Sequence, residues 1–113
     1  LTATNVGRLR LAIGAGAMNA LLCKVNQAGS VTDAMDAARY AQRHMCPVVM
    51  SVRSGETEDD ILSDISVALN AGVFKIGGPH GSDRGKSFNR FLEIEAALGP
   101  VARYAGRDYA QLA

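Results

Sequence analysis

The chain has 113 residues, of which 48% are hydrophobic, and carries 12 basic side chains against 11 acidic ones. This length fits one ordinary domain, and the near-neutral charge argues against a nucleic-acid-binding tail or a polybasic membrane patch. No apolar stretch approaches the ~20 residues that span a membrane, and Cys23 and Cys46 lack a metal-type spacing, so we expect a reduced, cytoplasmic protein without a transmembrane segment.

A helix, a strand and a second helix are expected first. Asn5 can cap a helix over roughly residues 6–17, and a strand over Ala20–Val25 follows, with residues 26–30 turning out of it. Ser30-Val-Thr-Asp33 has the form of a capping box, with the shorter Asp in place of Glu. The helix that it begins should end between His44 and Pro47. Its buried face is predicted from the spacing of Val31, Ala34, Met35, Ala38 and Ala41.

The second half repeats this order of strand and helix. Pro47–Val52 is predicted to be a buried strand, and Thr57–Asp60 to cap a helix whose apolar stripe is Ile61, Ile65, Ala68 and Leu69. Gly72 should end that helix, and a third strand is expected over Val73–Ile76, followed by a helix from about Arg84 to Leu98. This alternation predicts an α/β fold with a parallel sheet and right-handed crossovers, either a small open sheet or one arc of an eight-stranded barrel.

Each expected strand has a cation at or just past its end, namely Lys24, Arg53 and Lys75. Loops after the strands carry the chemistry in both architectures, so these cations should gather on one rim, where an anionic metabolite such as a phosphate ester can bind. Lys24 interrupts an apolar strand, and burial beside other cations brings a lysine toward the range of a general base. An ion pair at a strand end is the alternative.

The segment Arg53-Ser-Gly-Glu-Thr-Glu58 joins a strand to a helix. Arg53 can bind two oxygens of a phosphate, Ser54 offers a hydroxyl and a main-chain amide, and Gly55 lets the backbone approach. The acidic residues that follow are more typical of a helix cap than of a metal site. His44 and His80 are interpreted as solvated or capping residues, and the sequence contains no P-loop, dinucleotide fingerprint or zinc pattern.

With these motifs the chain resembles the carboxyl-terminal part of enolases, the phosphopyruvate hydratases of glycolysis. The family's strand motif ending in Leu-Lys-Val-Asn-Gln-Ile-Gly and its Ser-His-Arg-Ser-Gly-Glu-Thr-Glu-Asp motif are highly specific. The matching segments are Cys23-Lys-Val-Asn-Gln-Ala-Gly29, Ser51-Val-Arg-Ser-Gly-Glu-Thr-Glu-Asp59, Lys75-Ile-Gly-Gly-Pro79 with Ser82-Asp-Arg84, Thr2-Ala-Thr-Asn5 and Ala105-Gly-Arg-Asp-Tyr109.

The resemblance implies a (β/α) barrel of the enolase type, in which residues 1–113 form the carboxyl-terminal portion with its last three strands and contain no second domain. Lys24 would be the base that removes the C2 proton of 2-phosphoglycerate. Arg53 and Ser54 would hold the phosphate, and Lys75 would contact the carboxylate and hydroxyl region. Mg²⁺ would neutralise the enolate, with its ligands outside this chain and none among these residues.

The function implied by this resemblance is a carbon–oxygen lyase that converts 2-phosphoglycerate to phosphoenolpyruvate and water. Its expected partners are this substrate and product, the missing amino-terminal portion of an enolase chain, and further copies in a homo-oligomer. We expect the 113-residue chain by itself to be inactive and not to form a stable closed domain.

Two alternatives to this function differ in how well the sequence supports them. A non-catalytic enolase-like protein or fragment that retains the phosphate pocket is favoured by Val52, which stands where the family has a histidine. Another acid dehydratase of the superfamily is disfavoured because the Arg53-Ser54 pair is retained.

Overall fold

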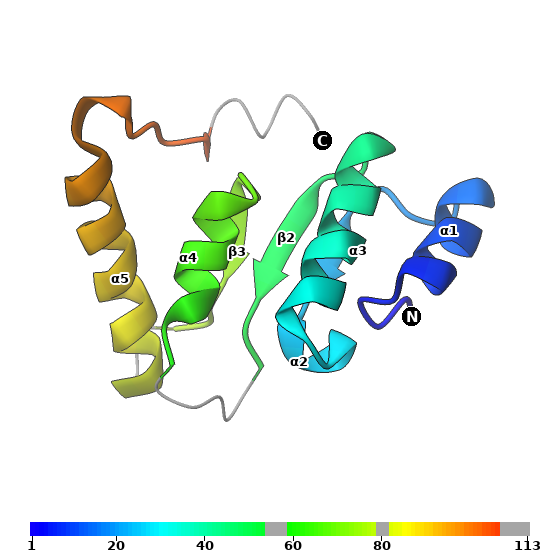
Figure 1. The fold of residues 1–113 in the computed structure, drawn as a ribbon, viewed down its shortest axis with the longest axis horizontal. Helices are drawn as coiled ribbons and strands as arrows, with labels where there is room; N and C mark the ends of the chain where they lie inside the picture. The colour runs from blue at the N-terminus through cyan, green and yellow to red at the C-terminus, as the bar shows by residue number, and fades with distance from the viewer. Residues whose placement is uncertain (54–58, 79–81, 107–113) are drawn as a thin grey trace.

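A computed structural model describes residues 1–53, 59–78 and 82–106 of the chain. Its centre is a parallel sheet of three strands in the order β1-β2-β3, formed by β1 (Leu21–Cys23), β2 (Val48–Ser51) and β3 (Val73–Lys75) (Figure 1). The helices are α1 (Val6–Gly14), α2 (Val25–Ala28), α3 (Val31–Arg43), α4 (Ile61–Ala68) and α5 (Ser82–Leu98), followed by the 3₁₀ turn η1 (Gly99–Val101). The strands and helices alternate as the sequence predicts.

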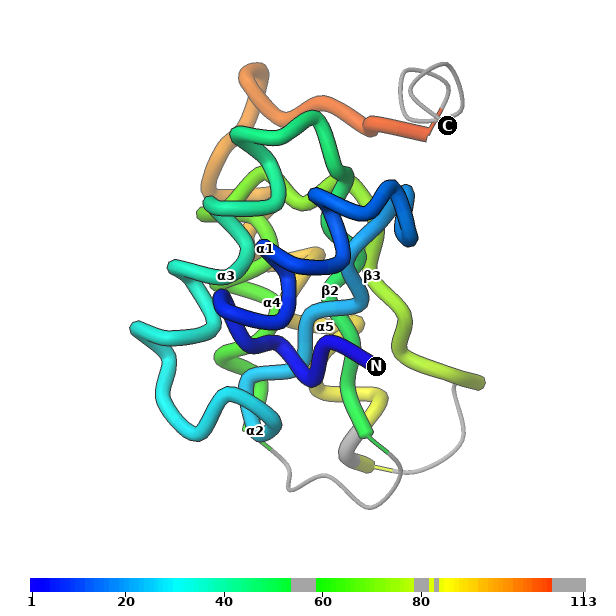
Figure 2. The backbone as a smooth tube through the Cα atoms, turned by 90° about the vertical axis from the view of Figure 1, so that its right-hand side faces the viewer, coloured from blue at the N-terminus to red at the C-terminus, as the bar shows by residue number. Residues whose placement is uncertain are grey.

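The helices bury one face of the sheet. In the turned view, α3 and α4 lie on the same side of β2 and β3 (Figure 2). Cys23 and Met50, which pair in register, are both fully buried on this side. Alanines of α3 pack against them, and their small side chains let the helix approach the strands closely. The buried alanines are Ala34, Ala37, Ala38 and Ala41.

The opposite face of the sheet is more open. Leu22, Val49 and Val73 occupy one row across the three strands, and the side chain of Leu22 is 45% exposed. Because successive side chains of a strand alternate between faces, this row points away from α3. The sheet thus has an apolar, covered face and a second face that the described helices leave partly accessible.

The start of α3 has the predicted cap, with a modified contact. Ser30 Oγ accepts the backbone N–H of Asp33 at 3.1 Å and donates to Asp33 Oδ2 at 2.8 Å. The shorter Asp side chain thus contacts the capping hydroxyl, whereas Glu in a capping box contacts the backbone N–H of the cap residue. Gly29, with a φ of 95°, supplies the left-handed turn between α2 and this cap.

Two expected boundaries in the first half were wrong. The first helix ends at Gly14 and not near residue 17, because Gly16 (φ 62°) and the bond from Ala17 N–H to the Ala12 carbonyl (2.9 Å) close its end. The first strand ends at Cys23, since the residues expected to continue it and turn form the single-turn helix α2, with Lys24 at its N-cap.

The helix α4 also differs from its prediction. It begins at Ile61, so Asp59 and Asp60 precede it, and Asp59 Oδ1 accepts the Ile61 N–H at 2.9 Å. Thr57, the first residue of the predicted capping segment Thr57–Asp60, lies outside the described residues. Of the expected stripe, Ile65 and Leu69 are buried, whereas Ile61 and Ala68 are exposed.

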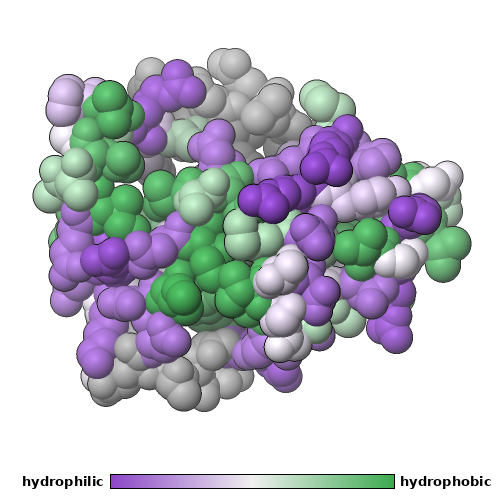
Figure 3. Space-filling model, in the orientation of Figure 1, coloured by the Kyte–Doolittle hydropathy of each residue, from purple (hydrophilic) through white to green (hydrophobic). Residues whose placement is uncertain are grey.

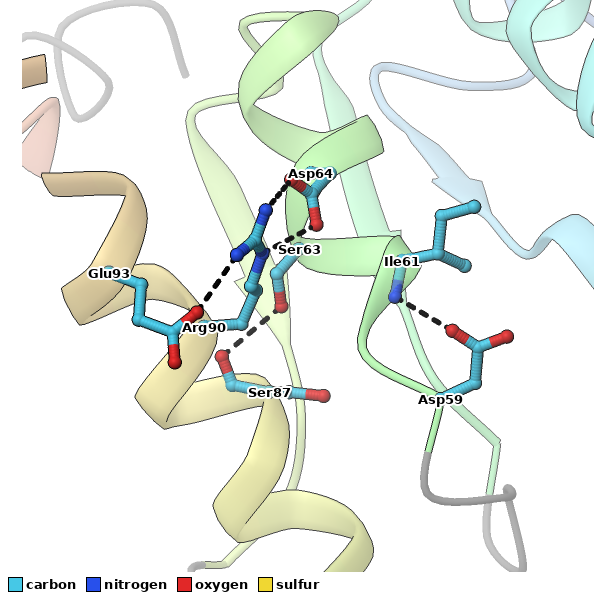
Figure 4. Close-up of polar contacts among 7 residues, drawn as sticks. All are labelled: Asp59, Ile61, Ser63, Asp64, Ser87, Arg90 and Glu93. Carbon is cyan, nitrogen blue, oxygen red and sulfur yellow. Dashed lines mark hydrogen bonds and ion pairs between the residues drawn. The ribbon is translucent and has the colours of Figure 1, made fainter. Parts of the chain in front are cut away.

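The reason for this difference is that α4 packs against α5 as well as against the sheet. Two serines, Ser63 and Ser66, are buried instead, and Ser63 Oγ donates to the Ser87 carbonyl at 3.2 Å (Figure 4). On α4, Ile61 and Val67 are 47% and 39% exposed. Figure 3 shows hydrophobic side chains gathered near the middle of this face of the molecule.

An ion-pair network joins α4 to α5 at the surface. Arg90 donates to both carboxylate oxygens of Asp64, at 2.8 and 2.9 Å, and to Glu93 at 2.8 Å (Figure 4). The Arg90 guanidinium lowers the pKa of Asp64.

Phe74 of β3 meets Phe91 of α5 edge-on, with ring centroids 4.9 Å apart. No helix among the described residues is both long and apolar enough to cross a membrane.

The cap of α3 yields a first prediction. Ser30→Ala removes the oxygen that accepts the Asp33 N–H, and loss of such a cap costs about 1 kcal/mol, or about five-fold in an opening equilibrium. Hydrogen–deuterium exchange at the first turn of α3 in the full-length protein should accelerate by about that factor. Thr32→Ala, at an exposed position of the same turn, is the control; equal acceleration in both variants would contradict the cap.

A second prediction concerns Cys23, a free thiol whose pKa is raised by burial from 9.0 to about 11. An unfolded chain ionises this thiol at lower pH than the folded one, so folded-state stability should fall as pH rises between these values. At about pH 10, iodoacetamide should therefore alkylate Cys23 much more slowly in native than in urea-unfolded protein. Equal rates in the two states would show that the thiol is not protected.

Candidate active site at the carboxyl ends of the strands

The carboxyl ends of the three strands place polar side chains on one edge of the sheet. Ser51, the last residue of β2, pairs in register with Lys75, the last residue of β3. On the other side, β1 pairs with β2 up to Cys23 and Met50, and Lys24 keeps an extended backbone with φ −130° and ψ 113°. Continuing that register by one residue brings Lys24 beside Ser51, on the face opposite the buried Cys23.

The ammonium group of Lys24 lies against the end of β2. Its Nζ donates to Ser51 Oγ at 2.6 Å and to the Val52 carbonyl at 2.8 Å. Ser51 Oγ also donates to the Val52 carbonyl, at 3.0 Å. Lys24 therefore points along the sheet edge toward the strand that leads to Arg53, and not toward the helices.

The backbone of Lys24 is held from the other side by Thr4. The Lys24 N–H donates to Thr4 Oγ1 at 3.0 Å, and that hydroxyl donates to Gln27 Oε1 at 3.3 Å. Thr4 is 1% exposed and has a φ of 52°, a left-handed conformation that β-branched residues rarely adopt. This contact has no local signal in the sequence, because its partners are separated by 20 residues.

A cavity of about 310 Å³ lies beside Lys24 on the open side of the sheet. Leu22, Met18 and several alanines give it apolar walls, while Lys24 and Gln27 supply polar groups. A mostly apolar hollow with a few polar groups is the usual form of a small-molecule site. Sequence reasoning had not singled out Gln27, which contributes here both to the wall and to the contact with Thr4.

The other two predicted cations lie along the same edge. Lys75 is exposed at the end of β3, and Arg53 is exposed two residues beyond the end of β2. Pairing of the two strands continues to this point, since the Val52 N–H donates to the Lys75 carbonyl at 3.2 Å. Ser54, the remaining predicted site residue, lies outside the described residues, as does His80.

The acidic side chains do not gather at this edge in the described part of the chain. Across residues 1–53, 59–78 and 82–106, no group of three His, Cys, Asp or Glu side chains could hold a metal ion. Asp59 caps the start of α4, and Asp64 pairs with Arg90. The edge thus offers hydrogen-bond donors and positive charge, which suit an anionic ligand.

Comparison with known proteins agrees with this fold. The model of the family "Enolase, C-terminal TIM barrel domain" matches residues 1–113. The enolase of Pyrococcus furiosus is 51% identical over 109 residues, covering 96% of this chain and 25% of that protein. The enolase of Methanocaldococcus jannaschii is 50% identical over 109 residues, covering 96% and 26% respectively. The chain thus spans about a quarter of the length of these relatives, and it belongs to the enolase family, within the carboxyl-terminal TIM-barrel domain.

Proposed function

We propose that the full-length protein containing this chain is a phosphopyruvate hydratase, which removes water from 2-phosphoglycerate to give phosphoenolpyruvate. The observation that carries the proposal is the position of Lys24, whose Nζ is held at the carboxyl edge of the sheet beside a cavity. Membership of the enolase family supports the reaction and the substrate. In this proposal residues 1–113 are the carboxyl-terminal portion of the barrel, with its last three strands.

Lys24 acts as the general base in this reaction. The C2–H bond of the substrate breaks, its proton passes to Nζ, and the electron pair stays on the substrate as an enolate. The C3–O bond then breaks, and the leaving hydroxide takes a proton from an acid outside this chain. The two oxygens that contact Nζ accept hydrogen bonds from the ammonium that proton transfer creates, so they favour the state that follows this transfer.

The neighbouring cations bind the substrate's anionic groups. Arg53 holds the phosphate together with Ser54, because a planar guanidinium can donate to two phosphate oxygens at once. Lys75 contacts the carboxylate and hydroxyl region. Their exposure at the ends of adjacent strands supports these roles, since loops and strand ends at this edge form the sites of α/β barrels.

We further propose that Mg²⁺ is the cofactor, bound by residues outside this chain. Its charge would stabilise the enolate. The described residues of this chain do not fit such a site, because they contain no cluster of suitable ligands. The remaining amino-terminal portion and further copies of the protein are its proposed partners. A cytoplasmic location is supported by the two free, buried cysteines.

A non-catalytic enolase-like protein that retains the phosphate pocket is the second candidate. Val52 favours it, because this residue stands where the family motif has a histidine and its side chain has no hydrogen-bonding group. Turnover separates the two candidates. A full-length protein that binds phosphoenolpyruvate but forms none from 2-phosphoglycerate in the presence of Mg²⁺ would establish the non-catalytic reading.

The base assignment predicts the effect of Lys24→Ala in the full-length protein. Removing a general base should lower kcat by about 10²–10⁴-fold, with a smaller change in KM, measured by the absorbance of phosphoenolpyruvate. Lys86→Ala, at an exposed position of α5, is the matched control and should retain wild-type kcat. A Lys24→Ala protein that keeps most of its kcat would overturn the assignment.

The same chemistry predicts that the 113-residue chain alone has no hydratase activity. A base and an anion site without the acid and the charge that stabilises the enolate should give only weak binding of phosphate. The measurement is phosphoenolpyruvate formation by the purified 113-residue chain with Mg²⁺, in parallel with the full-length protein. Turnover by the short chain would mean that it holds the complete site.

A further inference from the structure

We propose that Ser51 is a positioning residue for Lys24, and that its hydroxyl holds the Lys24 ammonium where the base works. The inference rests on the proposed function, because it takes Lys24 to be the base. Ser51 ends β2 and is 1% exposed, so its side chain is fixed by the sheet. Its Oγ lies 2.6 Å from Lys24 Nζ, a short distance even for a charge-assisted hydrogen bond.

The direction of the hydrogen bonds gives Ser51 a defined role. Its hydroxyl proton is used toward the Val52 carbonyl at 3.0 Å, which leaves the oxygen lone pairs for the Lys24 ammonium. The Val52 carbonyl also accepts from Nζ, at 2.8 Å. Lys24 Nζ is therefore bound by two acceptors on adjacent residues, the side chain that ends β2 and the carbonyl that follows it.

Ser51 differs in its contacts from Ser63, one of the two buried serines of α4. Ser63 is also fully buried, but its hydroxyl donates to the Ser87 carbonyl and so ties α4 to α5 (Figure 4). In the described part of the chain, the contacts of Ser51 Oγ go to Lys24 and to the carbonyl of the next residue, and do not reach α3, α4 or α5. A hydroxyl at this position is thus explained by Lys24 better than by packing.

The groups around Lys24 determine how loss of the Ser51 hydroxyl should shift the pH at which Lys24 loses its proton. Among the described residues, the charged groups at the ends of the neighbouring strands are the cations Arg53 and Lys75, while Thr4 and Gln27, which meet Lys24 and its backbone from the other side, are neutral. Ser51 and the Val52 carbonyl accept from the ammonium and so favour the charged form. Removing one of them should make the base lose its proton at lower pH.

The test compares Ser51→Ala with Ser63→Ala in the full-length protein with Mg²⁺. We expect Ser51→Ala to lower kcat by about 10- to 100-fold, the usual effect of losing a hydrogen bond to a charged group, with KM changed by less than about three-fold. The acidic limb of the pH profile of kcat should move to lower pH, because activity requires the neutral amine. Ser63→Ala should leave kcat and the limb unchanged, although it also removes a buried hydroxyl.

Two further results keep the test decisive. Ser51→Thr retains the hydroxyl and should recover most of the kcat and the wild-type limb. If Ser51→Ala does not fold, Ser51→Cys replaces it, because a thiol of similar size accepts hydrogen bonds poorly. A variant without the hydroxyl that keeps wild-type kcat and the wild-type limb overturns the inference, whereas the loss of kcat with a shifted limb supports it.

Different variants test the proposed function and the role of Ser51. If Lys24→Ala abolishes turnover while Ser51→Ala matches the wild type, the proposed function stands and this inference falls. If the wild-type protein has no turnover, or Lys24→Ala retains it, the base role itself is wrong and the inference falls with it. Exchange of the substrate C2 proton with deuterated solvent reports proton transfer directly, and Ser51→Ala should slow it together with kcat.

Discussion

The parallel register of the three strands is the constraint on which the candidate site depends. Ser51 pairs with Lys75, and the pairing of Cys23 with Met50 brings Lys24 to Ser51 one residue later. A slip of one residue in this pairing would reverse the faces of a strand, and would bury the polar residues against α3. The apolar face resists such a slip, because Cys23 and Met50 fit against the alanines of that helix. Packing on one side of the sheet thus determines the chemistry on the other.

Lys24 is bound through its backbone N–H and through its ammonium group, and the two sets of contacts differ in the backbone strain that they require. The ammonium is bound by oxygens at the end of β2, which lie in an ordinary strand and need no distortion. The backbone amide is bound by Thr4, whose φ of 52° costs of order 1–3 kcal/mol. Burial of Thr4 and its contact with Gln27 keep the conformation in place. Because a lysine side chain loses up to ~2 kcal/mol of rotamer freedom when fixed, holding Lys24 before substrate binds would remove that penalty from the proposed reaction.

The sequence predicted the elements that have strong local signals. The caps at Asn5 and Ser30 are present as expected, and every end of the three strands lies within two residues of its predicted position. The helix α2 was missed because four residues carry no helical period, and the buried face of α4 was missed because serines were not counted as core. Ser51 and Thr4 could not be identified at all. Each acts through a partner more than 19 residues away, and such a contact leaves no local pattern.

The side chain and the main-chain carbonyl of Val52 bear differently on the two functional candidates. Val52 lacks the imidazole of the family motif, and this loss concerns what its side chain offers to a substrate. Its carbonyl, however, is a main-chain group and accepts from Lys24 Nζ at 2.8 Å whatever side chain the residue carries. The hydrogen bonds from Lys24 Nζ to the Val52 carbonyl and to Ser51 Oγ therefore do not depend on the histidine. In the proposed reaction, a valine at this position would change a substrate contact and leave the contacts of Lys24 in place, so the remaining cations would have to bind the substrate without an imidazole.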